Sequence, residues 1–147
     1  MHFEIIKNST IRISFQYPSN WENNIEGNET YLFFNENYGS FRFTPVLIET
    51  TTFQIDKFLN DEYSEKKSLQ PQWEDYNGLK FLHYLEESEG DENTIIHYFI
   101  SGISSLLLVC SYAYDLSLHR THKINEEILK VKEILQTIKF ININKNG

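Results

Sequence analysis

Residues Ser105–Tyr114 read SLLLVCSYAY, and this stretch decides the fold. Leu106 and Leu108 alternate with Leu107 and Val109, so both sets of alternating positions are apolar. A strand that shows one face to water carries polar residues at every second position. The stretch therefore predicts a β-strand in a sheet that is covered on both faces.

Two segments before this strand have the same pattern. Leu79–Ser88 (LKFLHYLEES) and Thr94–Ser101 (TIIHYFIS) are apolar at both sets of alternating positions, and Gly102 ends the second of them. Short connections join neighbouring strands that run antiparallel. The three segments therefore predict an antiparallel meander that needs a cover on each face.

Two segments with helical spacing can supply these covers. Ile124–Phe140 (INEEILKVKEILQTIKF) places its apolar residues along one broad stripe, with glutamate and lysine mostly opposite. Phe53–Lys67 has looser helical spacing and follows three threonines that can cap a helix. We therefore expect an α+β domain in which an antiparallel β-sheet is sandwiched between helices, an α/β/α arrangement.

The first half of the chain predicts four further strands. Phe3–Lys7 and Ile11–Tyr17 alternate in polarity on either side of a polar turn. Thr30–Asn35 and Ser40–Glu49 predict a hairpin around the turn Asn37-Tyr38-Gly39. The length of 147 residues fits one domain that spans residues 1–147.

Composition narrows the class of protein. The net charge of -8 disfavours nucleic acid as a partner, because an acidic surface repels phosphates. The longest apolar run, Leu106–Val109, is far too short to cross a membrane. The single cysteine, Cys110, cannot form an internal disulfide, which indicates a reducing compartment. With no signal peptide visible at the start, we expect a soluble, cytoplasmic protein.

The stretch ISFQYPSNW, which ends at Trp21, carries a resemblance. The alternating strand ends at Pro18, which has no backbone N–H to donate to a neighbouring strand. After a short turn, the large ring of Trp21 is expected to fill the end of the hydrophobic core. This strand followed by a Pro-x-x-Trp motif resembles the motif near the start of the PsbP-like fold. The order that follows is also similar: a hairpin, a middle helix, a late meander and a closing helix, here EEILKVKEILQTIKF.

The PsbP-like resemblance implies an adaptor rather than an enzyme. The superfamily includes photosystem subunits, Mog-type Ran-binding proteins, DcrB-like lipoproteins and chaperones for secreted bacterial toxins. It implies a non-enzymatic protein-binding module of a bacterial cytoplasm, such as a chaperone, adaptor or immunity-type protein for a secreted toxin. It implies a protein partner and no cofactor, while the oligomeric state stays open.

Three aromatic residues are candidates for the contact with that partner. Trp73 and Tyr76 lie in QPQWEDYNG (Gln70–Gly78), and Tyr38 lies at the predicted hairpin turn. Tryptophan and tyrosine contribute more than other residues to the binding energy of interfaces. The alternative for Trp73 is that it packs beneath the sheet edge.

Four histidines support a rival hypothesis of a metal-binding protein or an enzyme. His119 and His122 are three residues apart, and His83 and His97 can join them if the meander makes their strands adjacent. No motif with a full set of ligands accompanies them, so we predict no metal site. A third hypothesis is a carrier whose aromatic interior holds a small apolar ligand.

Two further features have a structural interpretation. Cys110 lies in the middle of a strand without a base beside it, which indicates a buried apolar residue rather than a nucleophile. The acidic run Glu86–Glu92 does not match a calcium loop and predicts a solvated hairpin tip.

Overall fold

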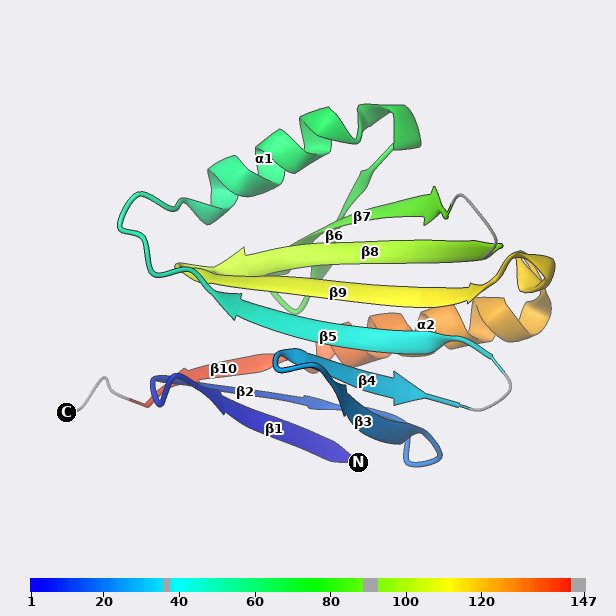
Figure 1. Ribbon diagram of the computed structural model, residues 1–147, viewed down its shortest axis with the longest axis horizontal. Coiled ribbons are helices and arrows are strands. Elements are labelled where there is room, and N and C mark those ends of the chain that lie inside the picture. Colours follow the sequence, from blue (N-terminus) through cyan, green and yellow to red (C-terminus); the bar gives the residue numbers. More distant parts are fainter. Residues whose placement is uncertain (36–37, 89–92, 144–147) are drawn as a thin grey trace.

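The computed structural model describes residues 1–35, 38–88 and 93–143, and within them the chain forms two antiparallel sheets and two α-helices (Figure 1). The large sheet has the strand order β3-β4-β5-β9-β8-β7-β6, and the small sheet has the order β1-β2-β10. Neither helix in these residues is long and apolar enough to span a membrane. The bounds are β1 (His2–Lys7), β2 (Ile11–Gln16), β3 (Glu22–Glu26), β4 (Thr30–Phe34), β5 (Ser40–Leu47), α1 (Ile55–Glu65), η1 (Lys67–Leu69), β6 (Gln72–Tyr76), β7 (Leu79–Glu87), β8 (Thr94–Ile103), β9 (Leu106–Asp115), η2 (Leu116–Leu118), α2 (His122–Gln136) and β10 (Lys139–Asn142).

The predicted antiparallel meander is confirmed. Strands β7, β8 and β9 are consecutive in the sequence and adjacent in the large sheet, with Leu82 opposite Ile100 and Ile100 opposite Val109. Strand β5 pairs with the far side of β9, so β9 lies in the middle of the sheet. The apolar character of both faces of β9 follows from this central position.

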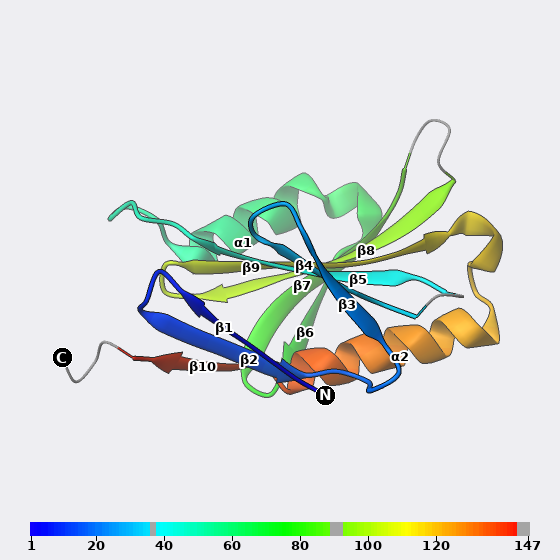
Figure 2. The ribbon, with the colours of Figure 1, turned by 60° about the horizontal axis from the view of Figure 1, so that its bottom comes forward.

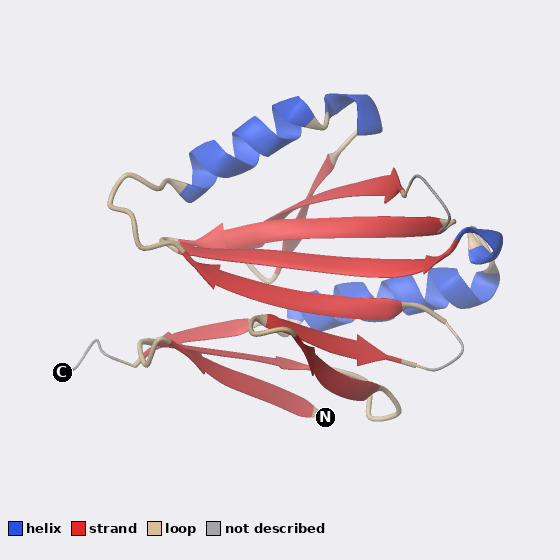
Figure 3. Cartoon of the chain, viewed as in Figure 1, coloured by secondary structure: helices blue, strands red, loops and turns tan. Residues whose placement is uncertain are grey.

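The predicted α/β/α sandwich is wrong, because a second sheet covers much of one face. We call this side the inner face. It packs against the small sheet and α2 together (Figure 2), with Phe15 of β2 against Phe33 of β4 and Phe43 of β5 at centroid distances of 5.3 and 4.9 Å. Figure 3 shows how much of the chain is strand. The domain is a β-rich α+β fold of two sheets.

Helix α1 packs on the opposite, outer face of the large sheet (Figure 2). Its buried residue Leu59 contributes to a cluster with Leu82, Ile100 and Leu107, and Ile55, Phe58 and Tyr63 pack against that cluster. The helix reaches the ends of β5 and β9 at one end and β6 at the other. On the outer face, this diagonal path leaves the first half of β5 and the last half of β9 without a covering helix.

Three strands were not expected from the sequence. Strand β3 is exposed at every residue, so it has no apolar alternation to indicate a strand. Strand β6 has only the short sequence QWEDY. The predicted terminal helix ends at Gln136 instead of Phe140, and Lys139–Asn142 pairs with β2 as strand β10. The expected turn residue Asn37 lies outside the described residues, whereas Trp21 is buried as predicted.

Candidate functional site

Three of the four candidate histidines come together on the inner face of the large sheet. His83 on β7 and His97 on β8 are diagonal neighbours in adjacent strands, and His119 follows η2 at the end of β9. Glu74 of β6 and Tyr114 of β9 complete a row of five side chains. We call these five residues, Glu74, His83, His97, Tyr114 and His119, the polar chain.

Consecutive members of the polar chain are hydrogen-bonded. The distances are 2.8 Å from Glu74 Oε2 to His83 Nδ1, 3.0 Å from His83 Nε2 to His97 Nδ1, 3.1 Å from His97 Nε2 to Tyr114 Oη and 2.8 Å from Tyr114 Oη to His119 Nδ1. His97 and Tyr114 are buried, and His83 and His119 are partly buried. The polar chain thus runs beneath the surface across four neighbouring strands.

Burial sets the protonation of the polar chain. Desolvation is the largest cause that lowers the pKa of His97 to about 3, and the charge of His83 acts in the same direction. Desolvation also lowers the pKa of His83, against the opposing effect of the hydrogen bond that His83 donates to Glu74. Burial alone would raise the pKa of Glu74, but hydrogen bonds from Tyr76 and His83 outweigh it and lower the pKa. At neutral pH Glu74 is therefore ionised, and His83 and His97 are neutral.

Helix α2 contacts the Glu74 end of the polar chain. Lys132 Nζ lies 3.6 Å from Glu74 Oε1, and the hydroxyl of Tyr76 donates a hydrogen bond to the same oxygen. At the other end, His119 lies two residues before Thr121, whose side chain caps α2. The polar chain therefore contacts α2 through Lys132 at one end and, at the other, lies just before the start of α2 in the sequence.

The histidines are not arranged as metal ligands. His83 and His97 use both ring nitrogens in hydrogen bonds, so no lone pair is left to share with a metal ion. Within the described parts of the chain, no group of three or more His, Cys, Asp or Glu side chains is placed to hold a metal. His122 lies apart, with an 84% exposed side chain paired to Glu126.

Cys110 is fully buried on β9, and desolvation raises the pKa of its thiol. A neutral thiol without solvent access is a poor nucleophile. Of the acidic run Glu86–Glu92, the last four residues lie outside the described residues. Glu86 lies 4.0 Å from Lys66 Nζ, at the end of α1.

Two of the three predicted partner-binding residues are packed inside the domain. Tyr76 is 7% exposed and belongs to the inner core, so it is not a surface contact. Trp73 is partly buried on the outer face, where its ring stacks on Tyr63 of α1 at a centroid distance of 5.5 Å. Lys80 Nζ lies 4.2 Å from the Trp73 centroid on the neighbouring strand. The alternative interpretation of Trp73, packing at the sheet edge, describes this position.

The outer face carries a surface that lies beside α1 and meets the cluster beneath the helix only at Tyr98. Two rows of side chains cross it from strand to strand in register. We call the two rows, with Thr94, the open sheet surface; the first is Leu32, Arg42, Ser111 and Tyr98, and the second is Phe34, Ser40, Ala113 and Ile96.

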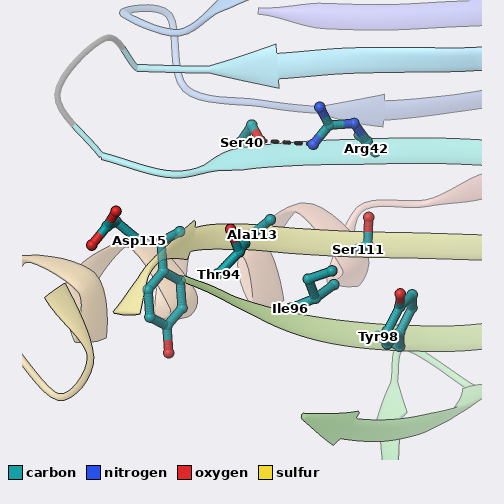
Figure 4. Close-up of a pocket in the computed structure, with 9 residues that line it drawn as sticks. Ser40, Arg42, Thr94, Ile96, Tyr98, Ser111, Ala113 and Asp115 are labelled. Atoms are coloured by element: carbon teal, nitrogen blue, oxygen red, sulfur yellow. Dashed lines mark hydrogen bonds between the residues drawn. The ribbon is translucent and has the colours of Figure 1, made fainter. Parts of the chain in front are cut away.

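Small residues in the centre of the open sheet surface create a hollow. Ser40, Ser111 and Ala113 line a hollow of about 590 Å³ with the larger Arg42, Ile96 and Tyr98 around them. Figure 4 shows this arrangement: Ser40 and Arg42 on β5, Ser111 and Ala113 on β9, and Ile96 and Tyr98 on β8. A neighbouring hollow of about 290 Å³ continues across Ser40 and Ala113 toward β4.

Tyr38, the third predicted partner-binding residue, lies at the border of the open sheet surface. It lines the smaller hollow beside Phe34 and Gly39. Arg42 contributes little free charge, because its Nε and Nη2 donate to the carboxylate of Glu26 at 3.0 and 3.1 Å. The surface is therefore a mixed apolar and hydroxyl face with Asp115 at its edge.

Sequence reasoning named three of the five members of the polar chain, His83, His97 and His119, but missed most of the open sheet surface. Glu74 lies on a strand that the sequence does not predict, and the helical spacing places Lys132 on the side of its helix that faces solvent. The outward alternation of Ile96 and Tyr98 was visible in TIIHYFIS. It gave no sign that the cluster beneath α1 would reach Tyr98 and stop short of Ile96, since that depends on the path of α1.

No family model matches the chain, and no curated protein sequence matches it. Among solved structures, a chain from Bacteroides thetaiotaomicron VPI-5482 is similar, with a TM-score of 0.71 and 18% identity. The match covers 90% of this chain and 46% of that chain. The likeness shows a shared fold and extends over less than half of the longer protein. The PsbP-like resemblance stays a prediction.

Proposed function

We propose that this protein is a non-enzymatic binding module that docks an apolar segment of another protein on its open sheet surface. The observation that carries the proposal is the incomplete cover of the outer face, where the cluster beneath α1 reaches Tyr98 but does not include Ile96, Ser111 or Ala113. Apolar side chains that a covering helix leaves accessible are typical of sites for protein partners. Tyr38 and Phe34 extend the surface with aromatic rings, which favour binding.

The shape and charge of this surface define the partner. The hollow above Ser40, Ser111 and Ala113 accommodates a protruding side chain, and the larger residues around it contact the flanks. The net charge of -8 and the edge carboxylate of Asp115 favour basic residues beside the apolar segment. The proposed occupant is therefore an apolar segment flanked by lysine or arginine.

The polar chain supports this ranking of functions. Its histidines bond to one another and to Tyr114, and they do not converge on a point where a substrate or metal would sit. The narrower role of a cytoplasmic chaperone or immunity-type protein for a secreted toxin rests on the PsbP-like resemblance.

Two matched substitutions test the proposal. Ser111→Arg places a long cation in the centre of the open sheet surface. Ser14→Arg makes the same change on β2, on the solvent side of the small sheet. A partner is first identified by capture on the wild-type domain, and its affinity for all three purified proteins is then measured by calorimetry.

We expect Ser111→Arg to weaken binding at least about tenfold, because it fills the hollow and repels a basic flank. Ser14→Arg should leave the affinity unchanged. Circular dichroism establishes that both variants are folded. Equal affinities for wild type and Ser111→Arg, or a loss with Ser14→Arg alone, would overturn the open sheet surface as the docking site.

A further inference from the structure

The inner core, which lies between the two sheets, is closed at one end and open at the other. Trp21 follows the far end of β2 and is 4% exposed, so it closes the core there. Where β2 begins, β10, the end of β5 and the turn between β8 and β9 lie together (Figure 1). They surround a hollow of about 470 Å³ that we call the end hollow, and its lining includes Ile11, Leu47, Glu49, Ile103, Ser104 and Phe140.

The end hollow is apolar inside because it is the open end of the inner core. Leu47 pairs in register with Leu106, and Phe140 pairs with Ile13, and both of these partners are fully buried. Ile11, Leu47 and Phe140 pack against the inner core and also line the hollow. An apolar group that enters the hollow therefore contacts side chains of the core and leaves water, which favours binding.

The charge at the end hollow is negative. Glu49 is the only charged side chain in the described lining, and the amide of Asn8 donates to its Oε1 at 3.1 Å. In the parts of the chain that the structure describes, Glu49 Oε2 has no hydrogen-bond partner and no cation pairs with this exposed carboxylate. Lys7, which precedes Asn8, lies 3.5 Å from Glu29 instead. The hollow therefore offers an unpaired carboxylate at its rim.

The rim of the end hollow is fixed by its turns. Ser104 and Ser105 line the hollow, and Ser104 has a φ of 55°, a left-handed conformation that is unfavourable for serine. The backbone N–H of Ile48 donates to the carbonyl of Ser105 at 2.8 Å, which ties this turn to the end of β5. The turn therefore places two hydroxyl groups on a rim that also carries Glu49.

We propose that the end hollow binds a small primary amine with an apolar tail, such as an alkylamine. The tail packs on Ile11, Leu47 and Phe140, and the ammonium group pairs with the carboxylate of Glu49. The volume of the hollow is in the range of small-molecule sites. The site is separate from the open sheet surface, which crosses the first half of β5, whereas the end hollow lies at the last residue of β5 and beyond.

Three probes with the same tail and different head groups test the charge of the ligand. We expect octylamine to bind the full chain at pH 7 at least about threefold more tightly than octanol, and octanoate to bind most weakly. Calorimetry measures the three affinities. Octanoate binding as tightly as octylamine, or octylamine showing no saturable binding at millimolar concentrations, would overturn the proposal.

Glu49→Gln tests the role of the carboxylate. We expect its affinity for octylamine to fall about threefold and its affinity for octanol to stay the same, because only the amine loses an ion pair. Glu22→Gln, at an exposed glutamate on β3, is the control and should change neither affinity. If Glu49→Gln keeps the wild-type ratio of the two affinities, Glu49 does not bind the head group and the proposal is wrong.

Butylamine and isoleucine methyl NMR spectra test the place of the tail. Butylamine should bind at least about tenfold more weakly than octylamine, because it has four fewer methylene groups to bury. Octylamine should shift the methyl signals of Ile11 and Ile103 and leave those of Ile96 on the open sheet surface unchanged. Equal affinities for the two amines, or shifts at Ile96 instead of Ile11 and Ile103, would overturn the end hollow as the site.

Discussion

At the scale of single residues, Glu127 is unusual because its carboxyl group is buried inside the domain. This carboxyl group lies on α2 and is 2% exposed, with the hydroxyl of Tyr112 donating to it at 3.1 Å. Desolvation raises the pKa of Glu127 above its ordinary value, although the hydrogen bond from Tyr112 opposes the shift. A carboxyl with a raised pKa stabilises the fold when it is protonated. That contribution is lost as the pH rises through the pKa of the folded state.

Glu127→Gln should therefore stabilise the domain at pH 7. The amide oxygen still accepts from Tyr112, but no charge is buried, and we expect the free energy of unfolding to rise by about 1 kcal/mol. The gain should shrink as the pH falls toward 4.5, where the carboxyl in the unfolded chain is itself protonated. Urea titrations at several pH values measure the effect. Glu133→Gln, at an exposed position of α2, is the control, and an equal gain there would contradict the explanation.

At the scale of elements, β6 and α1 depend on each other. Strand β6 is the last strand of the large sheet and pairs with β7 alone. Its Trp73 stacks on Tyr63 with an angle of 11° between the ring planes, which joins the edge strand to the helix above it. On the opposite face, Glu74 of the same strand holds Lys132 of α2. The short strand is thus fixed from both sides.

Trp73→Ala should destabilise the domain rather than act at a partner surface. The variant loses the stack on Tyr63 and the contact with Lys80, and we expect a cost of about 2 kcal/mol, less than for a fully buried tryptophan. Thermal and urea unfolding measure this cost. Leu69→Ala, at an exposed apolar residue after α1, should change stability little. A fully stable Trp73→Ala variant would show that the stack contributes nothing.

The elements differ in how well the sequence predicts them. The meander was predictable because β7, β8 and β9 are long and apolar at both alternations. Strand β10 was not, because Lys139 and Phe140 continue the helical pattern of α2 and only pairing with β2 makes them extended. For the same reason the second sheet was missed, and with it the true cover of the inner face. His83 and His97 could be placed together, whereas their partner Glu74 could not.

At the scale of the whole molecule, the lowered histidine pKa values couple stability to pH. The folded state keeps His97 neutral down to about pH 3, while an unfolded histidine binds a proton near pH 6.5. Between these values the unfolded chain holds more protons than the folded protein. The contribution of neutral His97 to the free energy of unfolding is therefore complete above pH 6.5 and is lost progressively as the pH falls.

The free energy of unfolding should fall on acidification from pH 6.5 to 5. His97 alone contributes an average slope of about 1 kcal/mol per pH unit over this window, because the unfolded histidine is only half protonated at pH 6.5. His97→Gln should reduce the slope by about that amount, whereas His122→Gln should leave it unchanged. Unfolding titrations in this window avoid most carboxylate protonation. A wild-type stability that is independent of pH from 6.5 to 5 would contradict the burial of a neutral imidazole.

The pairing of β10 with β2 governs when the domain can finish folding during synthesis. Lys139 pairs with Ser14 and Asn142 with Ile11, so the small sheet joins segments near opposite ends of the chain. A ribosome releases β10 long after β1 and β2, and the inner aromatic residues have only part of their final cover until then. Contacts between distant segments form slowly. Strand β2 therefore stays without its partner β10 for most of synthesis, and during this time a chaperone that binds nascent chains can bind it.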